Sequence, residues 1–151
     1  MSKLFRITLW ILSGIGLIAF FVQTLSTFLI SPLMGLLSLL IAAVLVTLIF
    51  YLLQRSPMWA RPARLWATLA FLWGGGVAVA LALISAGPVM QLAIGSGWVD
   101  AMMSWSGAYP EEISKATGVI FVLMSFRQLN RPWHGWMVGA VVGLGFEACE
   151  N

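Results

Sequence analysis

The chain has 151 residues, of which 61% are hydrophobic and only 9% are charged. Soluble domains carry about 45–50% apolar and about 25% charged residues, so this composition excludes a soluble protein and indicates an integral membrane protein. The net charge of +3 does not indicate a nucleic-acid partner, because the basic residues lie at the ends of apolar runs, where they act as topology signals.

Five apolar segments are predicted to cross the membrane, because a hydrocarbon core about 30 Å thick needs about 20 apolar residues per helix. The connection between the third and the fourth, residues 87–110, is interrupted by Gly and Pro and is predicted to be interfacial or re-entrant. We therefore predict an all-α, polytopic transmembrane helical bundle that forms a single membrane domain over residues 1–151. The predicted membrane helices cover residues 7–29, 33–53, 65–86, 111–126 and 133–151.

The basic residues predict the orientation of this bundle. With a cytoplasmic N-terminus, seven of the eight Lys and Arg residues fall on the cytoplasmic side, as the positive-inside rule requires. The eighth, Lys115, lies within the fourth helix beside two acids. The seven are Lys3, Arg6, Arg55, Arg61, Arg64, Arg127 and Arg131.

Four of the five acidic residues lie in the last two predicted helices. Glu111 and Glu112 begin the fourth helix, which runs inward, whereas Glu147 and Glu150 come about four turns into the fifth helix, which runs outward. Helix rise places both pairs about 20 Å from the inner ends of their helices, so the four carboxylates are predicted at one depth near the outer face. An ionised side chain at membrane depth costs on the order of 2.5–3.5 kcal/mol, and four acids against Lys115 need a metal ion, shared protons or a further basic partner.

The spacing also predicts which faces of these two helices meet. Glu111 and Lys115 are one turn apart. On the fifth helix a small-xxx-small strip leads to the acids and is predicted to let a neighbouring helix approach closely. The residues on that face are Gly139, Gly143, Glu147, Glu150 and Asn151.

Structural roles also explain some of these residues. Pro110 suits the first turn of a helix, where an acid is favoured at the positive end of the helix dipole. This alternative explains one of Glu111 and Glu112 well, but two adjacent acids with Lys115 less well.

Glu147 and Glu150 are alternatively explained as acids at a helix terminus that lies at the outer membrane interface. His134, beside two tryptophans, is predicted to be interfacial, and Cys149 to be a small packing residue.

The triple glycine Gly74 to Gly76 in the third predicted helix has a structural explanation as well. It is predicted to mark close helix packing or a kink rather than a hinge for substrate entry.

The acidic motifs resemble those of the PrsW-type intramembrane proteases, which are related to the CAAX prenyl proteases and the bacteriocin-immunity proteins. "PEEISK", Pro110 to Lys115, matches the EExxK motif of that family, and "GAVVGLGFEACEN", Gly139 to Asn151, matches its glycine-rich second motif ending in FExxE and Asn. The two motifs in order on successive helices make the resemblance specific over residues 110–151, whereas residues 1–109 match only as generic membrane helices.

The resemblance implies a hydrolase of the bacterial plasma membrane that cleaves a membrane-anchored protein, such as an anti-sigma factor, near the extracytoplasmic face. One glutamate of the first pair is then expected to take a proton from water, while Lys115 holds a carboxylate ionised or donates to the oxyanion. The assignment of roles among the glutamates stays open. The catalytic candidates are Glu111, Glu112, Lys115, Glu147 and Glu150.

The family is metal-dependent, so the resemblance also implies a metalloprotease, with zinc as the expected ion and histidines on later helices as ligands. His134 lies about 20 Å from Glu147 by helix rise and is not predicted to be one of them. We therefore expect the chain to be the N-terminal part of a longer protease, or a degenerate member of the family.

A function of a different class is compatible with the same acids. Intramembrane carboxylates at one depth also suit a non-enzymatic protein that binds a cation, relays protons or acts as an immunity or binding partner. The expected partners are the lipid bilayer and, for a peptidase, a membrane-anchored protein substrate, with no nucleic acid.

Overall fold

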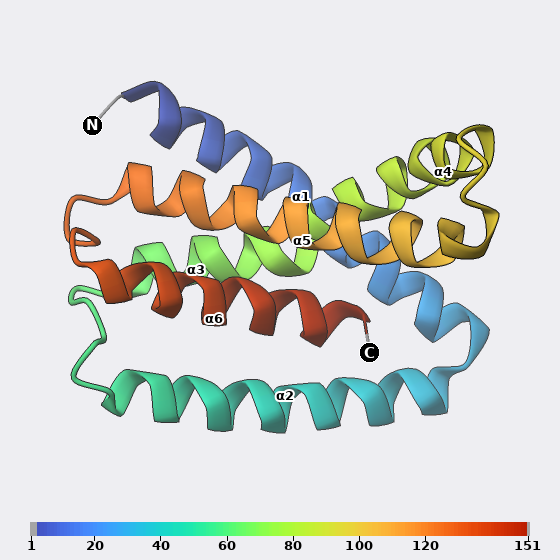
Figure 1. Ribbon diagram of the computed structural model, residues 1–151. Coiled ribbons are helices and arrows are strands. Elements are labelled where there is room, and N and C mark those ends of the chain that lie inside the picture. Colours follow the sequence, from blue (N-terminus) through green and yellow to red (C-terminus); the bar gives the residue numbers. More distant parts are fainter. Residues whose placement is uncertain (1–2, 151) are drawn as a thin grey trace.

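The computed structural model describes residues 3–150, and over that range the chain forms five helices joined by short connections (Figure 1). The third is one continuous helix made of α3, a π-helical segment η1 and α4. A short 3-10 turn, η2, precedes α5. The predicted all-α fold is confirmed. The bounds are α1 Lys3–Ile30, α2 Pro32–Arg55, α3 Arg64–Leu72, η1 Trp73–Ala78, α4 Val79–Gly95, η2 Val99–Ala101, α5 Met102–Ser125 and α6 Pro132–Glu150.

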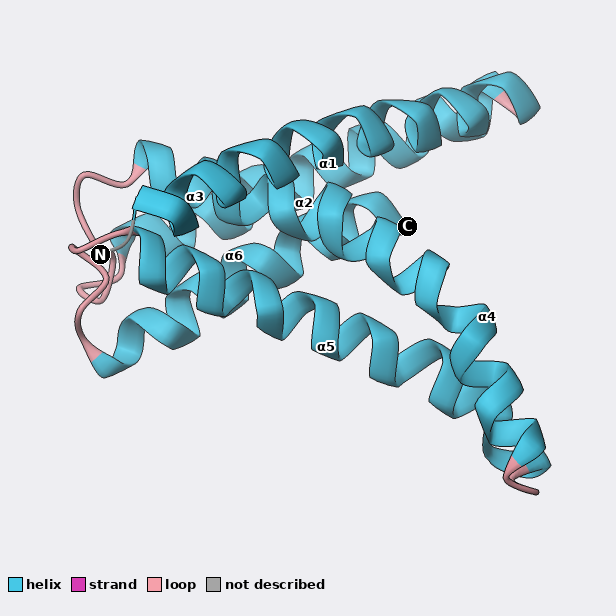
Figure 2. Ribbon diagram, turned by 90° about the horizontal axis from the view of Figure 1, so that it is seen from above, coloured by secondary structure: helices cyan, strands magenta, loops and turns pink. Residues whose placement is uncertain are grey.

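The helices extend between two ends of the molecule (Figure 1). The beginning of α1 and the connections at residues 56–63 and 126–131 share one end, which we call the loop end. The α1–α2 turn at Ser31 and the α4–α5 turn lie at the other, which we call the hairpin end. Figure 2 shows that the α1–α2 and α4–α5 hairpins diverge from the loop end and that α6 ends between them.

The loop end carries the basic residues. Arg55 ends α2, Arg64 begins α3, and Arg127 and Arg131 lie in the connection between α5 and α6. The predicted gathering of basic residues on one side of the bundle is therefore confirmed for these positions.

Residues 87–110 differ from the sequence prediction, because most of them are helical. The third helix continues to Gly95, and α5 begins at Met102, nine residues before Glu111. Pro88 and Pro110 lie inside these helices. A proline removes one backbone hydrogen bond but is tolerated where neighbouring helices pack around it, and here α4 and α5 pack along each other.

Three of the described helices are long and apolar enough to cross a membrane. They are α1, α2 and the continuous helix Arg64–Gly95. The two remaining helices, α5 and α6, carry the acids. α5 has 24 residues but contains three charged side chains near its middle, and α6 has 19 residues. The coarser prediction of a multi-pass membrane protein is thus confirmed, with three helices of clear membrane-spanning character.

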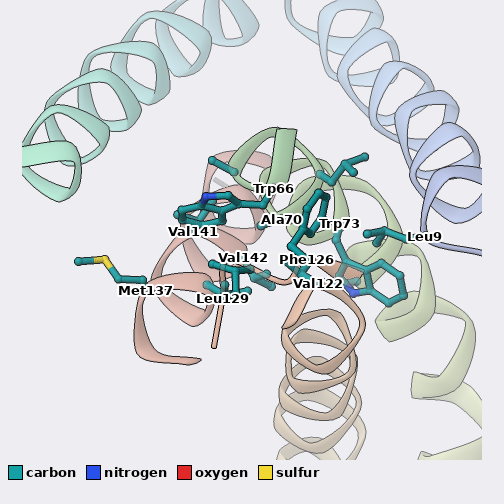
Figure 3. Close-up of a cluster of buried hydrophobic side chains, with 14 of the residues drawn as sticks. Leu9, Trp66, Ala70, Trp73, Val122, Phe126, Leu129, Met137, Val141 and Val142 are labelled. Atoms are coloured by element: carbon teal, nitrogen blue, oxygen red, sulfur yellow. The ribbon is translucent and has the colours of Figure 1, made fainter. Parts of the chain in front are cut away.

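The buried core lies where α1, α3, η1, α5 and α6 meet, toward the loop end (Figure 3). Trp66 and Trp73 are its largest fully buried side chains, with 0% and 1% of their surface exposed. Trp66 donates a hydrogen bond from Nε1 to the Ala60 carbonyl at 3.0 Å. By contrast, α2 buries only Gly35 and exposes its leucines along its length, as a lipid-facing helix does.

The triple glycine forms the point where three helices touch. A methyl group on Gly74 would collide with the Val142 carbonyl of α6, and one on Gly76 would collide with the Gly16 carbonyl of α1. The surrounding segment is the π-helix η1, an irregularity that widens one helical turn. The prediction of close helix packing at Gly74–Gly76 is confirmed.

Candidate functional site

The EExxK motif forms one turn of charged side chains in the interior of α5. Lys115 Nζ lies 3.0 Å from Glu112 Oε1 and 3.8 Å from Glu111 Oε2. The i,i+3 and i,i+4 spacing of an α-helix brings both carboxylates within reach of the same ammonium. Their surroundings differ, since the Glu111 side chain is 29% exposed and that of Glu112 is 72% exposed.

Lys115 also joins α5 to the second motif. Its Nζ lies 4.0 Å from the centroid of the Phe146 ring, the aromatic residue of FExxE on α6. An ammonium over a ring face is attracted by the ring quadrupole, so one lysine contacts the acids of one motif and the aromatic ring of the other.

The acids of the two helices are close enough to interact. Glu150 at the end of α6 is repelled by Glu111 across the helix pair and by Glu147 on its own helix, and it is attracted by Lys115. Glu147 and Glu150 both reach the protein surface. The structure therefore brings the two motifs together, as their predicted equal depth requires, and their catalytic roles stay predictions.

Trp73 of η1 fixes α5 beneath the charged turn. Its Nε1 donates a hydrogen bond to the Ser114 carbonyl at 3.1 Å, and its ring stacks on Phe121 at 5.3 Å between centroids. A methyl group on Gly118 would collide with the Trp73 ring, so glycine is required there for the indole to lie against α5. The backbone one residue before Lys115 is thereby anchored to the core.

Two contacts fix the end of α6. Gly145 lies against the backbone of Phe71 and Gly75, where any Cβ would collide with the Phe71 carbonyl. Gln23 of α1 donates a hydrogen bond from Nε2 to the Cys149 carbonyl at 3.0 Å. The last turn of a helix lacks partners for its carbonyls, so this amide satisfies one of them and ties α6 to α1.

A cavity of about 300 Å³ opens beside Glu150, between α1, α2 and the end of α6. Its wall includes side chains with amide or hydroxyl groups within two otherwise apolar helices, among them Gln23, Thr24, Thr27 and Ser38. The acids thus border a partly polar space that leads between the α1–α2 hairpin and α6.

Two sequence predictions about this region need correction. Pro110 is buried in the interior of α5, so Glu111 and Glu112 are not at a helix start and their position is not explained by the helix dipole. Gly139 and Gly143 do not form the close contact of α6, because a Cβ would make an ordinary contact with Val119 at the first and meet nothing within 4 Å at the second. Gly145 makes the close contact instead. Asn151, predicted on the same face, lies outside the described residues.

The residues that support the two motifs were not predicted from the sequence. Gln23 could have been found, since it is an amide within a long apolar helix. Trp73 and Gly118 could not, because a tryptophan and a glycine in apolar helices carry no signal of pairing with each other.

The contacts of Cys149 and His134 indicate structural roles. Cys149 is half-buried and packs against the core beside Gly75, as predicted for a packing residue. His134 is buried in the first turn of α6 at the loop end, and its Nδ1 accepts a hydrogen bond from the backbone N–H of Arg131 at 3.1 Å. This bond holds the first turn of α6, at the opposite end of the helix from Glu147. The position of His134 at the membrane interface stays a prediction.

The acids do not match the ligand set of a catalytic zinc. Such sites use three protein ligands drawn mainly from His, Cys and carboxylates. Within residues 3–150, no group of three His, Cys, Asp or Glu side chains is arranged to hold a metal ion. The cluster also contains Lys115, whose positive charge opposes a cation. We therefore derive no chemical step through a metal from these residues.

Comparison with known protein families decides the assignment. Residues 61–151, more than half of the chain, match the family described as PrsW family intramembrane metalloprotease. The chain belongs to the PrsW family. Comparisons with curated proteins and with solved structures found no match.

The family match extends further toward the N-terminus than the motifs do. It includes the continuous helix Arg64–Gly95 and the α4–α5 hairpin, whereas α1 and α2 lie outside it. PrsW proteins are classed as intramembrane metalloproteases, so membership places this chain in a membrane and implies a metal and a membrane protein substrate for the family.

Proposed function

We propose that the acids of α5 and α6 form the catalytic site of a peptidase that cleaves a membrane-anchored protein near the extracytoplasmic face. The observation that carries this proposal is the meeting of both family motifs at Lys115, which pairs with Glu112 and lies over Phe146, while Glu111 interacts with Glu150 across the two helices. The hairpin end of the molecule is then extracytoplasmic, and the basic loop end is cytoplasmic.

Glu111 is proposed as the general base. It is the more buried glutamate of its pair and the one that interacts with Glu150. Its carboxylate takes a proton from a water molecule, the resulting hydroxide attacks the carbonyl carbon of the scissile bond, and the proton passes to the leaving amine. Lys115, with Glu112 as its partner, places a positive charge where the carbonyl oxygen becomes negative.

Glu147 and Glu150 are proposed to orient the attacking water and the substrate. Both reach the surface at the end of α6, and Glu150 borders the cavity between α1 and α2. The α1–α2 and α4–α5 hairpins diverge on the side where α6 ends (Figure 2). The proposed route of a substrate chain is from the outer leaflet between these two hairpins. An anti-sigma factor with a single membrane helix is a substrate that could enter in this way.

The test is cleavage of a single-span anti-sigma factor in proteoliposomes by the full-length protein and by its Glu111→Gln variant. Loss of a general base lowers the rate by about 10²–10⁴-fold, so release of the substrate fragment is expected to fall at least about 100-fold. Asp100→Asn is the matched control, because Asp100 lies exposed at the tip of the α4–α5 hairpin. Equal activity of the Glu111→Gln variant and the wild type would remove Glu111 from the mechanism.

A further inference from the structure

A large cavity lies at the loop end, remote from the acids. It has a volume of about 1320 Å³ and is bordered by α1, α2, α3 and both connections of the loop end. The two connections are tied to each other, because Gln128 Nε2 donates a hydrogen bond to the Pro62 carbonyl at 2.9 Å. This bond holds two walls of the cavity in place.

Four arginines from separate segments line this cavity. Arg6 comes from α1, Arg61 from the α2–α3 connection, Arg64 from the start of α3, and Arg127 from the α5–α6 connection. Among residues 3–150, none of these four guanidinium groups forms an ion pair with a carboxylate.

The whole sequence offers no acid to neutralise this cavity. Its five acidic residues lie at the tip of the α4–α5 hairpin or in the motifs of α5 and α6. Like charges that converge around one space repel each other, and the repulsion is relieved by an anion bound between them.

The positive-inside rule explains why arginines occur at this end, but not why four of them surround one space. Arg55 and Arg131 lie at the same end and follow the same rule, yet neither lines the cavity. Arg55 lies over the Tyr51 ring at 4.4 Å, and Arg131 lies over the Trp133 ring at 5.6 Å. The loop end therefore holds two kinds of arginine, those that contact aromatic rings and those that face the cavity.

The side chains that line the cavity indicate which type of anion it binds. Guanidinium groups bind phosphate oxygens through paired N–H donors, and Gln54, Ser125 and Gln128 add polar groups to the same wall. Trp59 and Phe126 supply apolar surface beside them and are 8% and 9% exposed. A charged wall next to an apolar one, at the ends of membrane-spanning helices, matches a phospholipid whose headgroup is anionic and whose glycerol and acyl chains are apolar.

We propose that the arginine-lined cavity at the loop end binds the phosphate headgroup of an anionic phospholipid from the adjacent leaflet. The bound lipid contacts α1, α3 and both loops of the loop end. It lies next to the buried core against which α5 and α6 pack. This site is separate from the acids, and its test requires no proteolytic activity.

The experiment is calorimetric titration of the full chain in detergent micelles with short-chain phosphatidylglycerol, phosphatidylcholine and inorganic phosphate. Charge-assisted hydrogen bonds to phosphate predict binding of phosphatidylglycerol at least about tenfold tighter than that of the other two probes. Equal binding of phosphatidylcholine would show that no anionic site exists. Equal binding of inorganic phosphate would show a site for the free ion, and either result overturns the proposal.

A matched pair of double variants locates the site. Arg61→Gln with Arg64→Gln is expected to weaken phosphatidylglycerol binding at least about tenfold, because two charged contacts are lost. Arg55→Gln with Arg131→Gln removes the same charge from the same end and is expected to change binding less than about twofold. Equal weakening by both pairs would mean that binding follows the general positive potential of the loop end and would overturn the proposal.

Folding of each variant is checked by thermal unfolding in the same detergent. If the glutamine pair unfolds, Arg61→Lys with Arg64→Lys replaces it, because lysine keeps the charge but loses the paired donors. Weakening by the lysine pair supports the site, and affinity equal to that of the wild type contradicts it.

Discussion

At the scale of single residues, Lys115 is the point where the two motifs meet. Its ammonium contacts two carboxylates on α5 and lies 4.0 Å from the Phe146 ring centroid on α6. The ion pairs alone are expected to contribute little, because exposed pairs are worth about 0–1 kcal/mol. The contact with Phe146 is less exposed and less easily screened, so it is the one that couples the helices.

A double-mutant cycle measures this coupling. Lys115→Met and Phe146→Leu are expected to show an interaction free energy of about 0.5–2 kcal/mol in denaturant unfolding of the detergent-solubilised protein. The control cycle pairs Lys115→Met with Phe126→Leu, since Phe126 lies about 16 Å further along the chain by helix rise. Equal interaction energies in the two cycles would show that Lys115 has no specific contact with Phe146.

The acids themselves could be predicted from the sequence, but their supports could not. Charged residues in apolar helices are conspicuous, and the spacing of Glu111 and Lys115 already fixes their shared face. Trp73, in contrast, supports Ser114 through a hydrogen bond between residues 41 apart in the chain. Such a contact depends on how three helices cross, which residue types alone do not specify.

At the scale of the helices, Gly145 sets how closely α6 approaches η1. A Cβ at Gly145 would collide with the Phe71 carbonyl, whereas a Cβ at Gly143 would meet nothing within 4 Å. Spacing along α6 favoured Gly139 and Gly143, because a small-xxx-small pattern resembles a contact strip. The crossing at the triple glycine instead rotates α6 so that Gly145 faces the partner backbone.

The two glycines of α6 form a matched test. Gly145→Ala is expected to lower the free energy of unfolding by about 1–3 kcal/mol, because the backbone of Phe71 must move. Gly143→Ala is expected to leave stability unchanged or raise it by up to about 1 kcal/mol, since alanine favours the helix. Thermal unfolding in detergent compares them, and a larger loss for Gly143→Ala would contradict the described packing of α6.

The helix bounds show where local patterns mislead. Gly and Pro within residues 87–110 indicated a broken segment, yet α4 and α5 continue through Pro88 and Pro110. The reason is tertiary, because α4 and α5 pack along each other, and a proline inside a helix is tolerated where a neighbouring helix packs against it. The consequence is functional, since Glu111 and Glu112 occupy the interior of a helix with the core behind them.

At the scale of the whole molecule, charge is divided between two ends. The arginines lie at the loop end, and the acids lie in α5 and α6 or at the tip of the α4–α5 hairpin. Composition and the distribution of charge were sufficient to predict this division, because both follow from membrane insertion. The diverging hairpins and the cavity beside Glu150 were not predictable, since they depend on how the helices cross.

Cysteine labelling tests the orientation. In a Cys149→Ser background, Ser96→Cys at the hairpin end is expected to react with a membrane-impermeant maleimide added outside intact cells. Ser56→Cys at the loop end is expected to react only after the cells are opened. Labelling of Ser56→Cys from outside would reverse the orientation and place the acids toward the cytoplasm.

The most direct test of the central claim, that the acids of α5 and α6 act as one catalytic site, is the cleavage rate of Glu111→Gln, Glu150→Gln and their double variant. Residues that act as a unit have non-additive effects, so the double variant is expected to be no slower than the slower single variant. If the two losses instead multiply, or if Glu150→Gln cleaves at the wild-type rate, the two motifs do not form one site.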